Sequence, residues 1–238
     1  MAGTALLRRL NTPPRPATWV PATIGDSWPE TASARSLIID VPGWTDHVAG
    51  QHIDVRLTAA DGYQATRSYS LSSGPGEPPQ ITVERVDDGE VSPYLVDIAR
   101  SGDQIEVRGP LGGYFVWQPS DRPLVLIAGG SGIAPLRAMW RAGGGAIRLL
   151  YSARTADRII FARELASHDE LDTTIHLTRD QAPGHMSRRI GQSDVASALS
   201  GLDDPAVFIC GPTDFVESVA TFAAETANER SIRTERFG

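Results

Sequence analysis

The stretch that decides the fold of this chain is PLVLIAGGSGIAP, residues 123–135. Its first part, Leu124–Ile127, is a short apolar run, which is typical of a β-strand buried on both faces. A glycine-rich turn follows at once. Residues 133–140 then read as a helix, with Pro135 in the first turn, where a missing N–H costs nothing. The stretch therefore predicts a strand, a glycine turn and a helix in succession.

This turn has the glycine spacing of a loop that binds pyrophosphate. Glycines let the backbone approach a ligand closely, and the free N–H groups at a helix start face an anion. The familiar fingerprint is Gly-x-Gly-x-x-Gly or Ala, and here Gly130, Gly132 and Pro135 occupy those places. The third place is thus a proline. The same residues would also form a tight strand-to-helix turn that binds no ligand.

The size and charge of the chain bound its function. Its 238 residues suggest one large domain or two small ones, and 41% hydrophobic residues supply a core. Lys plus Arg is 22 and Asp plus Glu is 29, a net charge of −7. That balance argues against a nucleic-acid-binding protein and against binding to anionic membranes. It leaves room for a local basic patch that faces a protein partner.

The number of cysteines and the spacing of the histidines argue against an intrachain disulfide and against a metal site. The single cysteine, Cys210, forms no disulfide within the chain, which fits a reducing compartment, and it cannot hold an iron–sulfur cluster. The histidines lack the spacing of helical metal ligands, so we expect no metal site and interpret them as scattered surface or edge residues. They are His47, His52, His168, His176 and His185.

The N-terminal residues predict neither a membrane span nor an export signal. No apolar run approaches the length of a transmembrane helix. Arg8 and Arg9 are followed by polar, proline-rich sequence rather than by an apolar region. We therefore expect residues 1–17 to form a lead-in arm and the protein to be cytoplasmic.

Residues 18–119 have the period-two pattern of strands, punctuated by Gly and Pro turns, and predict a small antiparallel β-barrel. Residues 91–100 are the single helical stretch of this half. The predicted strands are Thr18–Ile24, Leu37–Val41, Ile53–Leu57, Tyr69–Leu71, Ile81–Val86 and Gln104–Val107.

A polar joint bounded by prolines, residues 119–123, marks the predicted domain boundary. From 123 to 238 apolar strands alternate with amphipathic helices, which predicts a doubly wound parallel sheet. The expected strands are Leu124–Ile127, Ala146–Tyr151, Thr174–Leu177, Ala206–Cys210 and Ile232–Phe237, and the expected helices include residues 133–140, a helix running to Leu165, Val195–Leu199 and Phe215–Ala224.

One arginine bears on the choice of nucleotide. In NAD-specific sites an acidic residue near the end of the second strand holds the ribose hydroxyls. Here Arg154 follows the strand Ala146–Tyr151. An arginine there suits a 2′-phosphate, and it would equally be an ordinary residue at the start of a helix.

Short motifs follow one another between Val20 and Phe237: RSYS at 67–70, GEVS at 89–92, GPLGGYF at 109–115, GGSGIAP at 129–135, CGP at 210–212 and ERF at 235–237. Together they resemble the ferredoxin–NADP reductase superfamily, close to its oxygenase-reductase and bacterial ferredoxin-reductase-like members. The proline of the glycine loop belongs to the family form. The resemblance implies an antiparallel β-barrel flavin domain followed by an α/β doubly wound parallel-sheet nucleotide domain.

The resemblance implies a set of flavin-binding residues. Tyr69 would lie against the isoalloxazine ring, Ser70 would hydrogen-bond near flavin N5, and Arg67 would contact flavin phosphate. Phe237 would cover the flavin face that nicotinamide must reach. The second phosphate motif begins the helix of the barrel half, where Ser92 could instead be a simple N-cap. The expected set is Arg67, Ser68, Tyr69, Ser70, Gly89, Glu90, Val91, Ser92 and Phe237.

The resemblance also implies the nicotinamide nucleotide site. Thr178 and Arg179 stand where NADP-dependent members carry Ser/Thr-Arg for the 2′-phosphate, with Arg188 or Arg189 assisting, although NADH-using relatives also carry an arginine here. Cys210 would lie beside the nicotinamide, or it is a buried structural cysteine. The expected set is Gly129, Gly130, Ser131, Gly132, Ile133, Pro135, Arg154, Thr178, Arg179, Arg188, Cys210, Gly211 and Pro212.

The function implied is that of an FAD-dependent NAD(P)H oxidoreductase, with Ser70, Cys210 and Glu235 as catalytic residues. NADPH is favoured over NADH, and FAD over FMN. Electrons would pass to a separate ferredoxin-type, haem or oxygenase partner, because the sequence shows neither the iron–sulfur domain nor the globin fused in many relatives. The alternatives are a free-flavin, ferric-chelate or quinone reductase, and a non-enzymatic flavin- or nucleotide-sensing subunit. The chain ends in Phe237-Gly238, where plant-type reductases have a terminal tyrosine, so it resembles the oxygenase-reductase branch.

Overall fold

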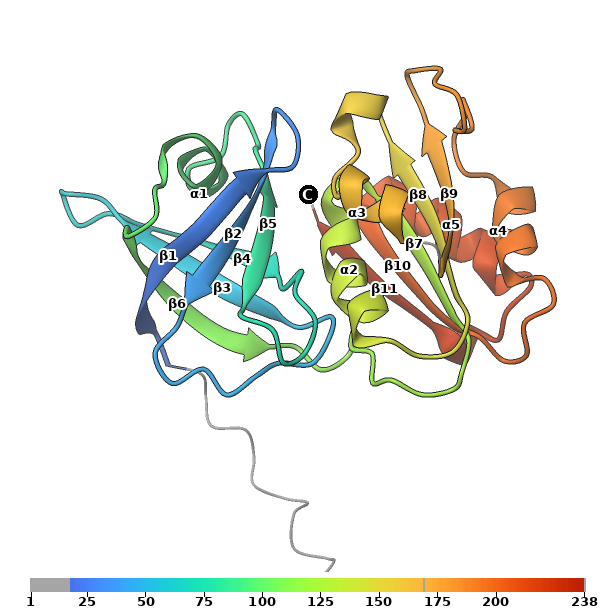
Figure 1. The fold of residues 1–238 in the computed structure, drawn as a ribbon, viewed down its shortest axis with the longest axis horizontal. Coiled ribbons are helices and arrows are strands. Elements are labelled where there is room, and N and C mark those ends of the chain that lie inside the picture. Colours follow the sequence, from blue (N-terminus) through green and yellow to red (C-terminus); the bar gives the residue numbers. More distant parts are fainter. Residues whose placement is uncertain (1–17, 169, 238) are drawn as a thin grey trace, which may run out of the picture.

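A computed structural model of the chain describes residues 18–168 and 170–237. The predicted arm, residues 1–17, lies outside the described residues. The described chain forms two sheets joined by a connector, the segment 112–123 (Figure 1). The predicted domain limits, 18–119 and 123–238, stay a prediction, and the connector spans the proposed boundary between them.

The first half is an antiparallel sheet with strand order β4-β3-β6-β1-β2-β5. The sheet curls until its outer strands meet, because Leu71 bridges Ile81 and the Ser72 N–H donates to the Gln80 carbonyl at 2.8 Å. Alternate side chains such as Leu37 fill the interior. The strands are β1 (Val20–Pro29), β2 (Ala34–Asp40), β3 (His52–Thr58), β4 (Gln64–Ser70), β5 (Gln80–Glu84) and β6 (Gln104–Leu111).

The predicted barrel is confirmed, with local differences at the ends of its elements. Strand β4 begins at Gln64, five residues before the predicted start at Tyr69, because pairing with β3 from Thr58–Gln64 to His52–Ser70 extends through exposed polar positions that carry no apolar signal. The predicted helix 91–100 is a short α-helix, α1 (Val91–Pro93), followed by a π-helical turn, η1 (Tyr94–Ile98). It ends where Ala99 turns to an extended backbone.

The second half is a parallel sheet with strand order β11-β10-β7-β8-β9, as the alternating pattern predicts. The buried strand β7 lies in the middle, and every one of its residues is inaccessible. The strands are β7 (Leu124–Gly129), β8 (Ile147–Ala153), β9 (Leu171–Leu177), β10 (Ala206–Pro212) and β11 (Ile232–Phe237), and the helices are α2 (Ile133–Ala142), α3 (Ala162–Ser167), α4 (Gln192–Leu199) and α5 (Thr213–Ala224), with single 3-10 turns η2 (Gly130–Gly132), η3 (Ala156–Arg158) and η4 (Glu229–Ser231).

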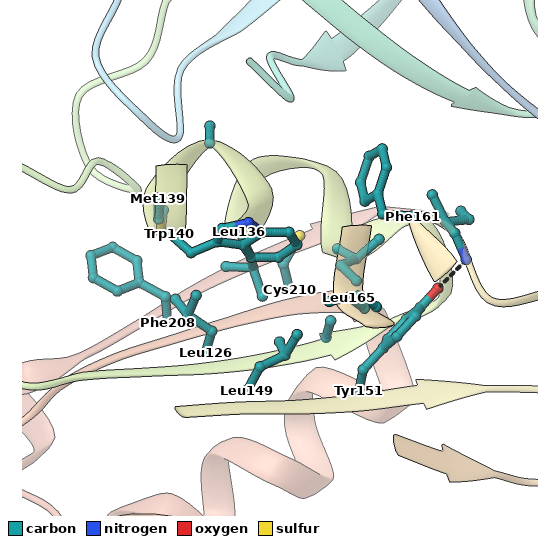
Figure 2. Packing of buried hydrophobic residues seen from close by; sticks show 14 of the residues in the cluster. Leu126, Leu136, Met139, Trp140, Leu149, Tyr151, Phe161, Leu165, Phe208 and Cys210 are labelled. Atoms are coloured by element: carbon teal, nitrogen blue, oxygen red, sulfur yellow. Dashed lines mark hydrogen bonds between the residues drawn. The ribbon is translucent and has the colours of Figure 1, made fainter. Parts of the chain in front are cut away.

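Helices cover both faces of this sheet. Helices α2 and α3 lie on the face toward the barrel, while α4 and α5 cover the opposite face (Figure 1). In the core beneath α2 and α3, Trp140 packs edge-on against Phe161, and the Tyr151 hydroxyl accepts the Ile160 N–H at 3.2 Å (Figure 2). The predicted helix ending at Leu165 is the separate turn η3 and helix α3, because the chain between them is not helical.

Charged side chains on α2 and α3 tie the sheet to the barrel. The buried Arg137 donates to Glu164 Oε2 at 2.6 Å and to the carbonyl of Ser72 in the barrel at 2.8 Å. Arg141 bonds both Glu164 and the barrel residue Glu77. Because these guanidinium groups bridge the two halves, they hold the glycine turn at the start of α2 against the barrel.

The expectation that the histidines are surface or edge residues is wrong for two of them. His176 on β9 is fully buried, and His47 is 5% exposed. His47 Nε2 lies 2.9 Å from the Ser73 carbonyl, so a backbone partner makes its burial possible. The backbone of Met186 pairs with His176 at this edge of the sheet. The burial of His176 lowers the pKa of its imidazole.

Candidate functional site

A cleft of about 810 Å³ lies where the barrel meets the carboxyl ends of the parallel strands. Strand β4, the start of α1, the start of α2 and the end of β11 all contribute to it. Its lining includes every residue of the predicted flavin set, together with Ser131, Pro135, Cys210 and Glu235. The fold therefore brings residues of five separated motifs to one cavity.

One hydrogen bond joins the two halves inside the cleft. The Ser70 hydroxyl on β4 donates to Glu235 Oε1 on β11 at 3.0 Å, across 165 residues of sequence. Burial raises the pKa of the Glu235 carboxyl, and the bond from Ser70 partly offsets that rise. Glu235 is thereby suited to hold a proton next to the Ser70 hydroxyl.

Cys210 lies next to Glu235, since the two residues pair in register on β10 and β11. The side chain is 1% exposed, and burial raises the pKa of the thiol well above its usual range, with the Glu235 charge acting in the same direction. The thiol therefore stays protonated and is a poor nucleophile. It can form one wall of the cleft through packing rather than through reaction.

On the barrel side, Tyr69 and Arg67 have different surroundings. Tyr69 is half-buried, and its loss of solvent raises the pKa of the phenol, so the ring is neutral. The exposed Arg67 guanidinium donates to the Thr66 carbonyl at 2.7 Å. Among residues 18–168 and 170–237, no carboxylate lies within 4 Å of it. A phosphate can therefore approach this guanidinium.

The second phosphate motif is a tight turn. A Cβ at Gly89 would lie 3.0 Å from both Ser92 Oγ and the Val86 carbonyl, so glycine is the residue that fits. Ser92 Oγ accepts the Val86 N–H at 3.1 Å and holds this turn, while the N-cap position of α1 belongs to Glu90. Ser92 therefore stabilises the turn through this hydrogen bond and is not the N-cap of the helix.

The glycine loop after β7 is packed tightly against β10. A Cβ at Gly132 would lie 2.3 Å from the Cys210 carbonyl oxygen, and one at Gly129 would lie 2.8 Å from the Phe215 ring. Gly130 has a left-handed backbone, with φ +56°. Close packing against β10 and α5 therefore requires Gly132 and Gly129, and the left-handed backbone favours glycine at 130, independently of any ligand. Ser131 and Pro135 of the same loop line the cleft.

The remaining predicted nucleotide residues follow the carboxyl edge of the sheet. Beyond the ends of β8 and β9, the Arg179 N–H donates to the Arg154 carbonyl at 2.8 Å and the Thr178 N–H donates to the Ala153 carbonyl at 3.0 Å. Arg154 and Arg179 are both exposed there. Arg188 instead pairs with Asp194, its Nη2 lying 2.6 Å from Oδ1. The positive charge of Arg188 is therefore already paired with the Asp194 carboxylate.

Some predicted residues support the cleft without lining it. Gly211 and Pro212 pair in register with Arg236 and Phe237, and so fix the end of β11. The predicted residues that are not among those lining the cleft are Gly129, Gly130, Gly132, Ile133, Arg154, Thr178, Arg179, Arg188, Gly211 and Pro212.

Sequence reasoning missed several parts of the site. His52 lines the cleft opposite Ser70 on the neighbouring strand, and its burial lowers the pKa of its imidazole. A second cavity of about 550 Å³ adjoins the first at Glu90, whose carboxylate accepts the Tyr63 hydroxyl at 3.0 Å. Tyr94 also lines it. The sequence offered one signal for His52. Side chains alternate between the two faces of a strand, so His52 lies on the same face of β3 as Asp54.

Neither a metal-binding cluster nor a membrane-spanning helix is found among the described residues. In 18–168 and 170–237, no group of three or more His, Cys, Asp or Glu side chains is placed to hold a metal ion. Within the same ranges, no helix has the length and apolar character needed to cross a membrane.

Comparison with known proteins identifies both halves. Residues 32–116 match the family model of an oxidoreductase FAD-binding domain, and residues 126–221 match that of an oxidoreductase NAD-binding domain. The chain is 33% identical over 228 residues to the ferredoxin reductase component of 3-ketosteroid-9-alpha-monooxygenase from Mycobacterium tuberculosis, which covers 87% of this chain and 62% of that protein.

A further relative is the electron transfer component of 2-halobenzoate 1,2-dioxygenase from Burkholderia cepacia, 29% identical, with 85% of this chain and 62% of that protein covered. The chain thus spans about three fifths of the length of the curated relatives it matches.

Solved structures show the same fold. A ferredoxin NADP+ reductase from Neisseria gonorrhoeae with bound FAD and NADP superimposes with a TM-score of 0.79 at 20% identity, covering 92% of this chain and 99% of that one. A ferredoxin reductase of carbazole 1,9a-dioxygenase superimposes with a TM-score of 0.80, also at 20% identity, covering 95% and 71%. With its matched FAD-binding and NAD-binding domains in this order, the chain belongs to the ferredoxin–NADP reductase superfamily of oxidoreductases.

Proposed function

We propose that the protein is an FAD-dependent NAD(P)H reductase that hands electrons to a separate acceptor. The observation that carries this proposal is the shared cleft, in which Ser70 from the barrel meets Glu235 and Cys210 from the parallel sheet. Bound flavin would accept hydride from the nicotinamide and release electrons one at a time. The chain itself would supply binding, orientation and control of a proton.

The residues of the cleft fit a flavin. Its volume of about 810 Å³ suits a ligand of this size. Arg67 offers a guanidinium that no carboxylate within 4 Å neutralises among the described residues, and the tight turn at Gly89 is compatible with close approach of a phosphate. The adjoining cavity beside Tyr63 and Tyr94 gives room for an adenosine half, which favours FAD over FMN.

Each residue of the junction has a separate role in this proposal. Ser70 fixes the Glu235 carboxyl through the 3.0 Å bond, and Glu235 holds a proton there because burial favours its neutral form. Cys210 forms an uncharged wall beside them. Phe237 lines the cleft at the end of β11 and would cover the flavin face that a nicotinamide must reach. The gain in rate would come mainly from proximity.

NADPH is the proposed reductant. Arg154 and Arg179 lie side by side beyond β8 and β9, exposed at the carboxyl edge of the sheet, where guanidinium groups suit a 2′-phosphate. Thr178 supports the same turn through its backbone bond to Ala153. We assign Arg188 no part in this contact, because it is paired with Asp194. A cytoplasmic location remains the expectation from the sequence.

The proposed acceptor is a separate redox protein. The names of the M. tuberculosis and B. cepacia relatives describe them as reductase or electron transfer components of oxygenase systems. A small-molecule acceptor is the competing function. Turnover with ferredoxin-type or haem carriers, compared with turnover on free flavin, ferric chelates and quinones, separates the two.

An anaerobic visible spectrum followed by stopped-flow mixing tests the core of the proposal. We expect flavin bands that bleach with NADPH, more slowly with NADH, and a loss of that preference in Arg179→Gln. Faster bleaching with NADH would reverse the nucleotide assignment. A protein that takes up no flavin would overturn the function, and one that binds flavin without bleaching would favour a sensing subunit.

A further inference from the structure

A chain of buried hydroxyl groups leads away from the cleft and ends at a carboxylate. Thr82 on β5 lines the cleft in which flavin is proposed to bind. Its Oγ1 lies 2.9 Å from the Oγ of Ser36 on β2, and the Ser36 hydroxyl donates to Glu30 Oε1 at 2.7 Å. Glu30 directly follows β1, and β1, β2 and β5 are neighbours in the barrel (Figure 1). We call Thr82, Ser36 and Glu30 the hydroxyl path.

The middle of the hydroxyl path is closed to solvent, whereas its outer end is not. Ser36 is fully buried and Thr82 is 5% exposed. Glu30 is half-buried, and its Oε1 also accepts the indole N–H of the exposed Trp28 at 2.8 Å. The path therefore begins at the wall of the cleft, passes through a position that water does not reach, and ends at a carboxylate in contact with solvent.

The hydrogen bonds of the path all point away from the cleft. An ionised carboxylate can only accept, so the single hydroxyl proton of Ser36 is used in the bond to Glu30. In the bond between Ser36 and Thr82, the Thr82 hydroxyl is therefore the donor.

The buried Ser72 hydroxyl forms a side branch of the path. It lies 2.9 Å from Thr82 Oγ1 and 3.3 Å from the Gln80 carbonyl, so the oxygen of Thr82 is the nearer acceptor. A hydroxyl oxygen has two lone pairs. One lone pair of Thr82 thus accepts from Ser72, and the second is left to accept a proton from the cleft.

A purely structural explanation covers only part of this arrangement. Ser36 and Thr82 are partners in register on β2 and β5, and cross-strand hydroxyl pairs stabilise sheets. Glu30 also ties the barrel to the parallel sheet, because its Oε2 accepts the Phe161 N–H at 3.3 Å. An amide would fill this structural role of Glu30 as well as a carboxylate does. Only a carboxylate can also take up a proton.

We propose that Thr82, Ser36 and Glu30 carry a proton out of the cleft when electrons leave the flavin. This inference rests on the proposed function. One NADPH and two oxidised one-electron acceptors give NADP+, two reduced acceptors and one proton, and that proton has to leave the cleft.

Each group of the path breaks one O–H bond and forms another. Thr82 Oγ1 accepts the proton and passes its own hydroxyl proton to Ser36, and Ser36 passes its proton to Glu30. The Glu30 carboxyl then releases the proton to solvent, and the two hydroxyls rotate back to their first orientation. The path is separate from the Ser70–Glu235 pair, which comes from β4 and β11.

The test follows proton release from FAD-loaded protein that has been reduced with light and EDTA. Rapid mixing with ferricyanide, a one-electron oxidant, in weakly buffered solution gives two signals. The visible spectrum reports the return of the flavin bands, and a pH-indicator dye reports the released protons. Since this reaction contains no NADPH, a failure of NADPH to bleach the flavin would concern the proposed function and leave this test intact.

The variants separate the path from its surroundings. Glu30→Gln is the main variant, because the amide keeps the shape and an acceptor oxygen but takes up no proton. Thr82→Val removes the first hydroxyl, and Thr82→Ser restores it. Ser72→Ala is the matched control, because it removes an equally buried hydroxyl that contacts Thr82 but lies off the path.

We expect Glu30→Gln and Thr82→Val to slow the dye signal by about tenfold or more relative to wild type. Thr82→Ser and Ser72→Ala should release protons as fast as wild type. Proton release at the wild-type rate in Glu30→Gln and Thr82→Val, or an equal loss in Ser72→Ala, would overturn the proposal.

A second readout needs neither reductant nor acceptor. NMR measures how fast the hydroxyl protons of Ser36 and Thr82 exchange with solvent in oxidised, FAD-loaded protein. We expect this exchange to be about tenfold slower in Glu30→Gln than in wild type or Ser72→Ala, because the carboxylate that relays the proton is gone. Identical exchange rates in Glu30→Gln and wild type would contradict the path even if the flavin reacts normally with NADPH.

Discussion

At the scale of single residues, the site depends on the hydrogen bond between Ser70 and Glu235. Neither residue stands out in the sequence by itself. Ser70 is one of several serines near the flavin motif, and Glu235 lies beside the end of the chain. Their 3.0 Å bond joins the two halves, and partial burial raises the pKa of the Glu235 carboxyl. The proposed chemistry therefore belongs to the pair rather than to either residue.

The Ser70→Ala variant tests that pair. We expect flavin to stay bound, because Arg67, Tyr69 and the Gly89 turn are untouched, while flavin reduction by NADPH slows by about tenfold or more. Rapid mixing measures the rate, and the visible spectrum checks the flavin content. An unchanged reduction rate would remove Ser70 from the mechanism.

Glu235 also predicts a pH dependence of stability. Its pKa is raised in the folded protein, so between the ordinary value of 4.5 and the raised one the folded state keeps a proton that the unfolded chain has lost. This contribution to stability is present below pH 4.5 and is lost as the pH rises through that window. Thermal unfolding of Glu235→Gln and wild type should therefore show Tm of the variant gaining on wild type from pH 4 to pH 7. A constant difference would contradict the raised pKa.

At the scale of elements, the turn between β7 and α2 shows why a glycine pattern alone is ambiguous. Pyrophosphate binding was one interpretation and a ligand-free tight turn the other. The loop meets the backbone of β10 so closely that Gly132 has no room for a side chain. Packing thus accounts for this glycine, and the placement of Ser131 and Pro135 in the cleft is the feature that connects the loop with a ligand.

Gly132→Ala should be destabilising whether or not a nucleotide binds. Its Cβ would lie 2.3 Å from the Cys210 carbonyl oxygen, so the two loops must separate, at a cost of about 1–3 kcal/mol. Urea unfolding measures the difference. Gly113→Ala is the control, because nothing lies within 4 Å of its added Cβ, and it should stay within about 0.5 kcal/mol of wild type.

At the scale of the whole molecule, a network of charged side chains fixes how the barrel meets the sheet. Arg137 lies between Glu164 of α3 and the Ser72 carbonyl of the barrel, and Arg141 bridges Glu164 to Glu77. Burial and these arginines act in opposite directions on the Glu164 carboxyl, and the net pKa is lowered. The cleft depends on this arrangement, since its walls come from both halves.

Arg137→Ala should weaken the junction between the halves. Removing one partner leaves the Ser72 carbonyl and part of Glu164 without a donor, so we expect a loss of about 2–4 kcal/mol in the free energy of unfolding. Calorimetry should also show a broader transition as the halves become less coupled. Arg163→Ala on the exposed side of α3 should change neither quantity.

Local patterns were sufficient for the fold class, and the family motifs pointed to the flavin-set residues that line the cleft. Period-two alternation predicts the barrel strands, apolar runs such as Leu124–Ile127 predict the buried parallel strands, and the motifs at 67–70 and 235–237 carry the family resemblance. These features can be predicted from the sequence because each depends on residues that are only a few positions apart. Polar edges of elements, such as the start of β4, are not, because only strand pairing defines them.

Contacts between distant segments decided the rest. The Ser70–Glu235 bond and the bond from Arg137 to the Ser72 carbonyl each join residues whose spacing along the chain carries no signal. Their proximity follows from barrel closure, from the strand order β11-β10-β7-β8-β9 and from the arginine network between the halves. Burial and electrostatics depend on that three-dimensional neighbourhood, so the raised pKa of Glu235 was decided only by the tertiary structure.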